Sequence, residues 1–285
     1  TLLNYWEIGS RISVRPELVD RNGTRGGPMM LAPRSWEWNA DFKTDERKMV
    51  WIEPSIEIAG QSMGGARRAE MGLELWMRPS PRIQLAVEPQ FEMVRTGAQF
   101  VARTGALAYA PTFGTRYLFA ELDRREFGIE TRLNVTFSPR MTLQLFAQPL
   151  LSSGDFLSYK QLQAPRTYSF DTFQEGTYVA GPGAPTCTAG RTCQAPDGTR
   201  LIDFDGDGSS DFEFEDRDFN VRSLIGNAVF RWEYRPGSAI FLVWQRQQED
   251  EAMVGAFDFG RDARALFRAP ARNVFLIKAS YWVGF

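Results

Sequence analysis

With 285 residues, the chain is long enough for one large β domain or two smaller ones, and its formal net charge of −2 at pH 7 provides no basic surface for nucleic acid. Its mean hydropathy is −0.32, and no stretch approaches the roughly 18–20 apolar residues that a transmembrane helix needs. We therefore expect neither a nucleic-acid-binding protein nor a helical membrane protein.

Apolar and polar residues alternate with a period of two along most of the chain, which indicates β-strands with one apolar and one polar face. In 125–137, for example, Phe127 and Leu133 lie on one face, whereas Glu130 and Arg132 lie on the other. In chain order the pattern predicts twelve strands: 3–14, 34–43, 48–59, 67–77, 82–94, 98–109, 115–122, 125–137, 141–151, 221–234, 238–248 and 272–285.

Most of these strands are longer than the roughly 5–6 residues that are usual in soluble proteins. A tilted strand crosses a bilayer with about 9–11 residues, so most of these strands are long enough to span one. The pair 98–109 and 115–122 alternates less cleanly, and an extension of the neighbouring strands beyond the membrane is the alternative. A secreted soluble β-sandwich with one wet face is the alternative for the whole chain.

The connections are of two kinds. Three tight turns contain proline, at 78–81, 138–140 and 235–238, whereas long polar segments occupy 15–33, 152–220 and 249–271. Short periplasmic turns and long outer loops are typical of outer-membrane barrels. We therefore predict an all-β chain, a transmembrane antiparallel up-and-down β-barrel over residues 1–285, located in the bacterial outer membrane, with an extracellular loop at 152–220.

The two faces of these strands predict a lipid side and a lumen. A charged side chain on the lipid face costs about 2–4 kcal/mol for Arg or Lys at the midplane, so the charged faces should point into a polar lumen. Aromatic residues near the tight turns, including Phe137, Trp232 and Tyr234, indicate a girdle at the membrane interface. The predicted lumen-lining residues are Glu53, Glu57, Glu70, Glu74, Glu88, Glu92, Glu130, Arg132, Arg231, Glu233 and Lys278.

The last strand alternates up to the final residue of the chain, with Phe275, Ile277, Tyr281, Val283 and Phe285 on its apolar face. This pattern resembles the C-terminal strand that outer-membrane insertion machinery recognises. The chain begins without a signal peptide, so we expect either a mature form or the C-terminal part of a longer barrel protein.

Catalytic patterns are weak. The chain has no His, which excludes Ser-His-Asp and Cys-His hydrolases and the usual His-based metal sites. A pair of carboxylates could serve a glycosidase, but the predicted strands carry so many Glu residues that no pair stands out. We therefore expect no enzyme activity, with a membrane-embedded enzyme acting on surface glycan or lipid as the alternative.

Two features of the long loop suggest stabilising links. Cys187 and Cys193 are separated by five residues and predict a disulfide in an oxidising compartment, with two free thiols as the alternative. The segment 203–211 has the spacing of a calcium loop, and its expected ligands are Asp203, Asp205, Asp207, Ser209 and Asp211. Position 12 of such a loop should be Glu, but here it is Phe214, so the alternative is a solvated acidic loop. Calcium is the only cofactor that these sequence patterns suggest.

Several segments resemble an uncharacterised family of bacterial outer-membrane proteins, domain-of-unknown-function family 5916. The most specific block runs from Asp218-Phe219-Asn220-Val221-Arg222 through Trp232-Glu233-Tyr234-Arg235-Pro236-Gly237 to Val243-Trp244. Shorter similar segments are Thr24-Arg25-Gly26-Gly27-Pro28, Arg78-Pro79-Ser80-Pro81-Arg82, Gly114-Thr115-Arg116-Tyr117 and Gln144-Leu145-Phe146-Ala147-Gln148-Pro149. The resemblance implies a C-terminal barrel preceded by a carbohydrate-binding, family-9-like domain, and it supplies no catalytic residues.

Taken together, these patterns predict an outer-membrane barrel that serves as a channel, translocation unit or membrane anchor and is linked to carbohydrate binding or uptake. The expected partners are outer-membrane lipid, the barrel-insertion machinery through the C-terminal strand, and glycans. An anchor with a plugged lumen is the nearest alternative.

Overall fold

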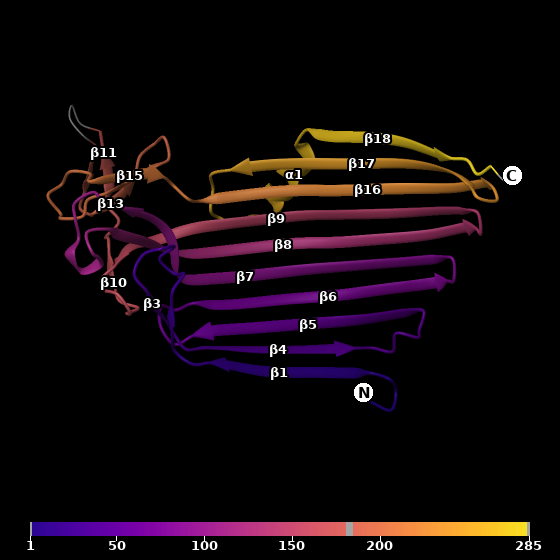
Figure 1. Ribbon diagram of the computed structural model, residues 1–285, viewed down its shortest axis with the longest axis horizontal. Helices are drawn as coiled ribbons and strands as arrows, with labels where there is room; N and C mark the ends of the chain where they lie inside the picture. The colour runs from indigo at the N-terminus through magenta and orange to yellow at the C-terminus, as the bar shows by residue number, and fades with distance from the viewer. Residues whose placement is uncertain (1, 181–184, 284–285) are drawn as a thin grey trace.

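The computed structural model describes residues 2–180 and 185–283, and the statements below concern these residues. The chain is all-β apart from one α-helix and a short 3-10 turn. Its centre is one antiparallel sheet in which neighbouring strands follow the chain, in the order β1-β4-β5-β6-β7-β8-β9-β16-β17-β18 (Figure 1). These strands are Glu7–Arg15, Ser35–Lys43, Val50–Gln61, Arg67–Ser80, Ile83–Thr104, Arg116–Ser138, Met141–Leu162, Phe219–Arg235, Ser238–Ala252 and Ala271–Ser280.

The sheet has ten long strands, so the predicted number of twelve is wrong. The predicted strands 82–94 and 98–109 are one continuous strand, β7, and 115–122 and 125–137 are one strand, β8. The extension of neighbouring strands, which was the alternative at this point, is therefore correct. β9 also continues beyond its predicted end, so the connection to β16 covers 163–218 instead of 152–220.

The hydrogen-bond register keeps the two faces of the sheet separate across every strand. One face, here called the apolar face, joins Ile12 to Trp38, Met71 to Phe91, Phe91 to Phe127 and Leu242 to Ile277. The opposite, polar face joins Glu57 to Glu70, Glu92 to Glu126, Asn134 to Gln144 and Asn227 to Gln245. In β16–β18 the polar face becomes mixed, because Val229 pairs with Val243 and Val243 with Leu276.

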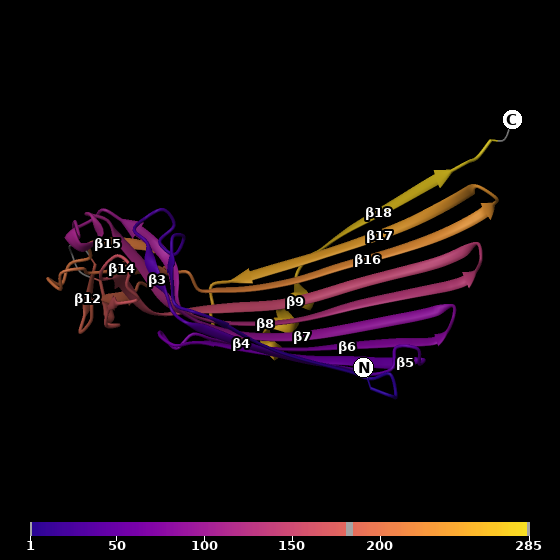
Figure 2. The same ribbon diagram turned by 60° about the horizontal axis from the view of Figure 1, so that its bottom comes forward.

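The sheet is strongly curved and open within the described residues. Figure 2 shows it bending into a trough, and β1 and β18 form its two edges without pairing to each other. The three tight turns at 78–81, 138–140 and 235–238 lie at the same end of the strands, and the long connections lie at the other (Figure 1). The strand order fits the up-and-down topology that was predicted.

A small β-rich unit, here called the cap, covers the end of the sheet with the long connections (Figure 1). It combines the far ends of β7–β9 with short strands: β2 Leu18–Asp20, β3 Met30–Ala32, β10 Phe170–Thr172, β11 Thr177–Val179, β12 Thr186–Thr188, β13 Thr192–Gln194, β14 Thr199–Ile202 and β15 Phe212–Glu215. The 3-10 turn η1, Ala110–Thr112, joins β7 to β8 within it. The cap has its own buried core, which includes Leu118, Tyr159, Phe173, Ile202 and Phe204.

The connection between β17 and β18 contains the helix α1, Phe259–Arg268, where the sequence predicted only a long polar segment. Asp258 caps the helix, because its carboxylate accepts a hydrogen bond from the Arg261 backbone N–H at 2.7 Å. No helix among the described residues has the length and apolar character that a membrane crossing requires.

The predicted C-terminal strand is shorter than expected. β18 ends at Ser280, so Tyr281 and Val283 follow it, and Phe285 lies outside the described residues. Phe275 and Ile277 lie on the apolar face of this edge strand and are 74% and 78% exposed.

Candidate functional site

The polar face of β5–β8 brings eight glutamates together in two rows that run across the strands. The upper row, nearer the cap, consists of Glu57, Glu70, Glu92 and Glu126, which face one another in sequence along the register. The lower row consists of Glu53 opposite Glu74 and of Glu88 opposite Glu130. The pairs Gly72–Gln90 and Leu75–Val87 place Glu74 and Glu88 beside each other, which joins the two halves of the lower row.

Two arginines bridge all four glutamates of the upper row. The Arg68 guanidinium lies 2.8 Å from the Glu57 carboxylate and 2.7 Å from that of Glu92, and it also contacts Glu70. Arg124 pairs with Glu92 and lies 3.5 Å from Glu126. Glu92 is therefore the shared acceptor of both arginines, and its side chain is only 13% exposed. This network is an extended set of charge-assisted hydrogen bonds across four strands.

The lower row also has two basic partners, but each of them pairs with only one glutamate of the row. Lys43 lies 3.7 Å from Glu53, and Arg132 lies 2.6 Å from Glu130. Glu74 accepts a hydrogen bond from the Trp76 indole at 3.3 Å, but neither Glu74 nor Glu88 forms an ion pair with any residue that the structure describes. Like charges that face each other across strands are destabilising, so the two central carboxylates do not stabilise the sheet.

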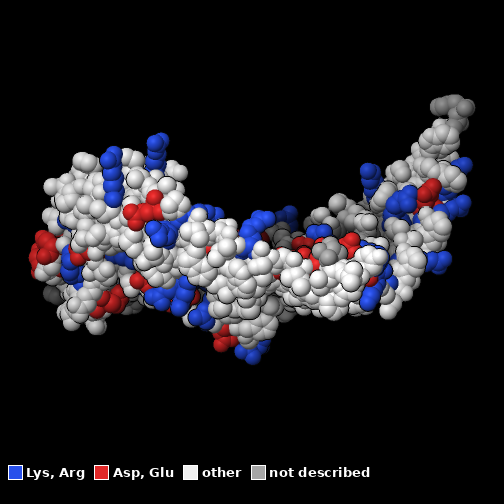
Figure 3. All heavy atoms as spheres, turned by 90° about the horizontal axis from the view of Figure 1, so that it is seen from below, with Lys and Arg blue, Asp and Glu red and all other residues white. Residues whose placement is uncertain are grey.

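Six of the eight glutamates, all except Glu53 and Glu57, line a hollow of about 560 Å³ on the concave side of the sheet. Gln90, Gln148 and Ser55 complete its polar wall. Figure 3 shows acidic and basic side chains gathered in this hollow. Chemically, the site offers carboxylates to a cation or to a hydroxyl-rich solute, and it contains neither a cysteine nor a histidine.

The predicted lumen residues all lie on the polar face, but they do not form one site. Eight of them lie in the hollow or directly beside it, namely Glu53, Glu57, Glu70, Glu74, Glu88, Glu92, Glu130 and Arg132. Arg231 and Glu233 instead pair with each other at 2.8 Å beside the tight turn at 235–238, and Lys278 lies over the Phe241 ring. Arg68, Arg124 and Glu126 carry the ion-pair network and were not among the predicted residues, although the same alternation places them on this face.

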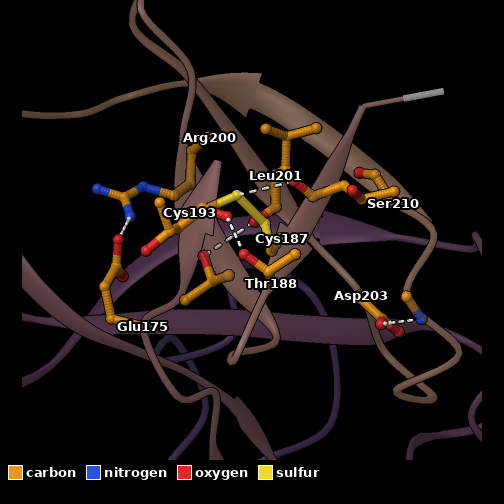
Figure 4. Close-up of a disulfide and its surroundings, with 12 residues drawn as sticks. Glu175, Cys187, Thr188, Cys193, Arg200, Leu201, Asp203 and Ser210 are labelled. Atoms are coloured by element: carbon orange, nitrogen blue, oxygen red, sulfur yellow. Dashed lines mark hydrogen bonds and ion pairs between the residues drawn. A yellow bond between two sulfur atoms is a disulfide. The ribbon is translucent and has the colours of Figure 1, made fainter. Parts of the chain in front are cut away.

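The predicted disulfide is present. Cys187 and Cys193 are bonded and join β12 to β13 in the cap (Figure 4). Close to it, the buried Arg200 guanidinium lies 2.6 Å from Glu175 and 2.8 Å from Asp216. The Tyr159 hydroxyl donates a hydrogen bond to Asp216 at 2.9 Å, so the same carboxylate ties β9 to the cap.

The acidic segment of the cap brings together three of the five predicted calcium ligands. Carboxylate oxygens of Asp203, Asp205 and Asp211 lie within 4.8 Å of one another, whereas the Asp207 carboxylate is not part of this group. The Asp203 carboxylate already accepts hydrogen bonds from the backbone N–H groups of Gly206 and Gly208. Phe214 packs edge to face against Tyr159 in the cap, so the position that supplies Glu in a complete calcium loop has a packing role here.

Within the hollow, the two rows predict opposite effects of removing one carboxylate. Glu92→Gln should lower the free energy of unfolding by about 1–3 kcal/mol, because two arginines lose their shared charged acceptor. Glu88→Gln should raise it by about 0.2–1 kcal/mol, because a like-charge contact disappears. Urea unfolding of the two variants beside wild type measures both effects. A change of the same sign in both variants would show that the presence or absence of an ion-pair partner does not distinguish the two carboxylates.

Calcium binding by the cap remains a prediction, and the geometry now distinguishes the three clustered aspartates from the other predicted ligands. At a hundredfold excess over its dissociation constant, Ca²⁺ should stabilise the protein by about 2.7 kcal/mol. Asp205→Asn should abolish this gain, whereas Asp207→Asn, outside the cluster of three, should retain it. Calorimetric titration of the whole chain and thermal unfolding measure the effect. An unchanged melting temperature in wild type with calcium would refute the site.

Comparisons with known proteins give a family match over part of the chain but no individual relative. No curated protein and no solved structure matches the chain. The family model described as "Domain of unknown function (DUF5916)" matches residues 196–285, which contain β14–β18 and α1. This match agrees with the resemblance noted in the sequence, whose most specific block lies in the same region. The match over residues 196–285 therefore supports membership of that family.

Proposed function

We propose that this chain forms the wall of a β-barrel in a bacterial outer membrane and that the polar lumen of the barrel conducts solutes with a preference for cations. The observation that carries the proposal is the register, which maintains one continuous apolar face across ten strands. A soluble sheet would have to cover this face with a second layer. Among the described residues, α1 and its flanking segment pack against this apolar face, and the rest of the face has no second layer over it.

The composition of the apolar face supports a lipid environment. Phe137, Trp232 and Tyr234 lie next to the tight turns and are 52%, 44% and 36% exposed. Aromatic rings at this level suit the headgroup region of a bilayer, and the aliphatic residues between them suit its hydrocarbon core. The residues 128–137 of β8 match the roughly 9–11 residues that a tilted strand needs to span that core.

The edges of the sheet support closure into a barrel. Unpaired backbone N–H and C=O groups are very costly in lipid, so β1 and β18 must pair with each other or with further strands. β18 exposes Phe275 and Ile277 along this free edge, which suits recognition by the insertion machinery before closure. The family resemblance adds an association with carbohydrate binding, which belongs to the proposal only through that resemblance.

The hollow on the polar face supports cation preference. Its lower row places Glu74 and Glu88 side by side without an ion pair among the described residues. Rings of carboxylates make a pore favour cations. A plugged barrel that serves only as an anchor would gain nothing from two adjacent carboxylates without an ion pair at this position.

Membrane insertion predicts a difference between two adjacent positions of β8. Leu133→Arg places a charge near the middle of the apolar face and should cost about 2–4 kcal/mol, whereas Asn134→Arg on the polar face should fold normally. Gel migration before and after boiling reports the folded fraction after refolding into lipid vesicles. If the wild-type chain folded in buffer without detergent or lipid, the membrane location would be wrong.

The channel function predicts a cation-selective conductance that depends on the lower row. In planar bilayers, Glu74→Gln combined with Glu88→Gln should move the ratio of cation to anion permeability toward unity. The double variant Glu213→Gln with Glu215→Gln, which removes the same charge from β15 in the cap, serves as the control. Folded, inserted protein without conductance would replace the channel with a plugged anchor.

A further inference from the structure

The helix α1 is held on the apolar side of the sheet, at the end of the strands nearer the cap. It contacts β9, β16 and β17 (Figures 1 and 2). The ring of Phe259 lies 5.2 Å from that of Phe127, and the ring of Phe257 lies 6.1 Å from that of Phe91. Because Phe91 and Phe127 belong to the apolar face, α1 lies on the side that the proposed function assigns to lipid.

Polar contacts fix the inner side of the helix. Asp262 is fully buried, pairs with Arg222 at 3.4 Å and accepts a hydrogen bond from Asn220 at 3.2 Å. The Gln248 side chain donates hydrogen bonds to the carbonyls of Leu266 and Ala269 at the end of the helix. These contacts join α1 to β16 and β17, so its orientation relative to the sheet is well defined.

The position of α1 along the strands coincides with the edge of the expected hydrocarbon core. It contacts β8 at Phe127, and residues 128–137 separate this contact from the tight turn at 138–140. That length is sufficient for one crossing of the bilayer, about 9–11 residues. The helix is therefore at the level of the headgroups on the side of the membrane with the long connections.

Beside its buried positions, α1 carries an apolar stripe, which begins at Phe259 against the sheet, and a cationic stripe. Phe259, Ala263 and Phe267 are spaced four residues apart and share one side of the helix, and the two phenylalanines are 54% and 66% exposed. Arg261, Arg264 and Arg268 form a second stripe. Arg261 pairs with Asp262, whereas Arg264 and Arg268 are exposed and have no ion pair in the part of the chain that the structure describes.

We propose that α1 is an interfacial helix that binds the anionic headgroups of the adjacent lipid leaflet, with Phe259 and Phe267 inserted at the acyl boundary and Arg264 and Arg268 bound to headgroup phosphates. Amphipathic helices with arginine beside aromatic residues lie in the plane of the interface in this way. The guanidinium group can donate two parallel hydrogen bonds to a phosphate, and a phosphate-rich surface supplies the negative charge that these arginines lack. The inference rests on the proposed membrane location and adds a specific lipid class to it.

The test measures which lipid is adjacent to α1. Phe267→Cys introduces a thiol that can be labelled with a fluorophore, since Cys187 and Cys193 are bonded to each other. The labelled protein is reconstituted in phosphatidylcholine vesicles that contain a small fraction of either brominated phosphatidylglycerol or brominated phosphatidylcholine. Brominated phosphatidylglycerol should quench the label more strongly, because each arginine enriches the anionic lipid locally by about fivefold.

Two double variants and a second label show whether the arginines of α1, and not membrane insertion in general, cause the excess quenching. Arg264→Gln with Arg268→Gln should remove the excess quenching by the anionic lipid, whereas Arg21→Gln with Arg103→Gln, exposed arginines of the cap, should retain it. A label at Ile277→Cys, on the apolar face of β18, reports insertion itself. Quenching at position 277 with equal quenching by both lipids at 267 would overturn the role of α1 alone. No quenching at either position would overturn the membrane location as well.

Discussion

The structure depends on the antiparallel register, which is maintained across ten strands without a change of face between the tight turns and the cap. In a pleated strand a shift of one residue exchanges the two faces, so a single error in pairing would place Glu92 or Glu130 beside Phe91 or Ile129. Tight turns contribute to this precision, since the turns at 78–81, 138–140 and 235–238 each fix the pairing of the strands that they join. The separation of an apolar and a polar face follows from this constraint.

The same register places glutamates opposite one another on the polar face, and ion pairs compensate for their repulsion only in part. Once Glu70 faces Glu92 and Glu92 faces Glu126, repulsion is built into the sheet, and Arg68 and Arg124 compensate for it by bridging several carboxylates at once. The lower row has no arginine between Glu74 and Glu88. The two rows therefore differ in how their carboxylates are paired: every glutamate of the upper row contacts an arginine, whereas Glu74 and Glu88 form no ion pair among the described residues.

Most of the sheet could be predicted from the sequence, because alternation reports which face a residue occupies. The prediction failed where the ladder is irregular. Register shifts between Thr96 and Gln99 and between Phe100 and Ala102 interrupt the alternation, so one strand, β7, was predicted as two. The ion pairs of the upper row were also missed, because they depend on which strands are neighbours, and that information is not contained in any single strand.

The helix α1 was missed for a different reason. Its two buried positions are Asp262 and Leu266, and one of them carries a charge. A helix that is attached by a buried carboxylate lacks the apolar stripe by which sequence analysis recognises a packed helix. For the predicted calcium loop the sequence signal was present, namely the spacing of the aspartates. The register of β14 and β15, however, packs Phe214 against Tyr159, so Phe214 supplies no ligand.

The strands β7–β9 pass from one environment to another along their length. Near the tight turns most of their apolar residues lie on one face, with Ala86 and Phe146 as exceptions, whereas at the cap the consecutive residues Tyr117, Leu118, Phe119 and Ala120 are all buried. A strand that is buried on both faces belongs to a conventional protein core, so the cap folds with its apolar side chains inside and the sheet below it with its apolar side chains outside. The bulges in β7 lie at this transition, and α1 lies on the sheet side of it. If the proposed membrane location holds, this boundary is where the bilayer surface would meet water, and the bulges of β7 mark it within the sheet.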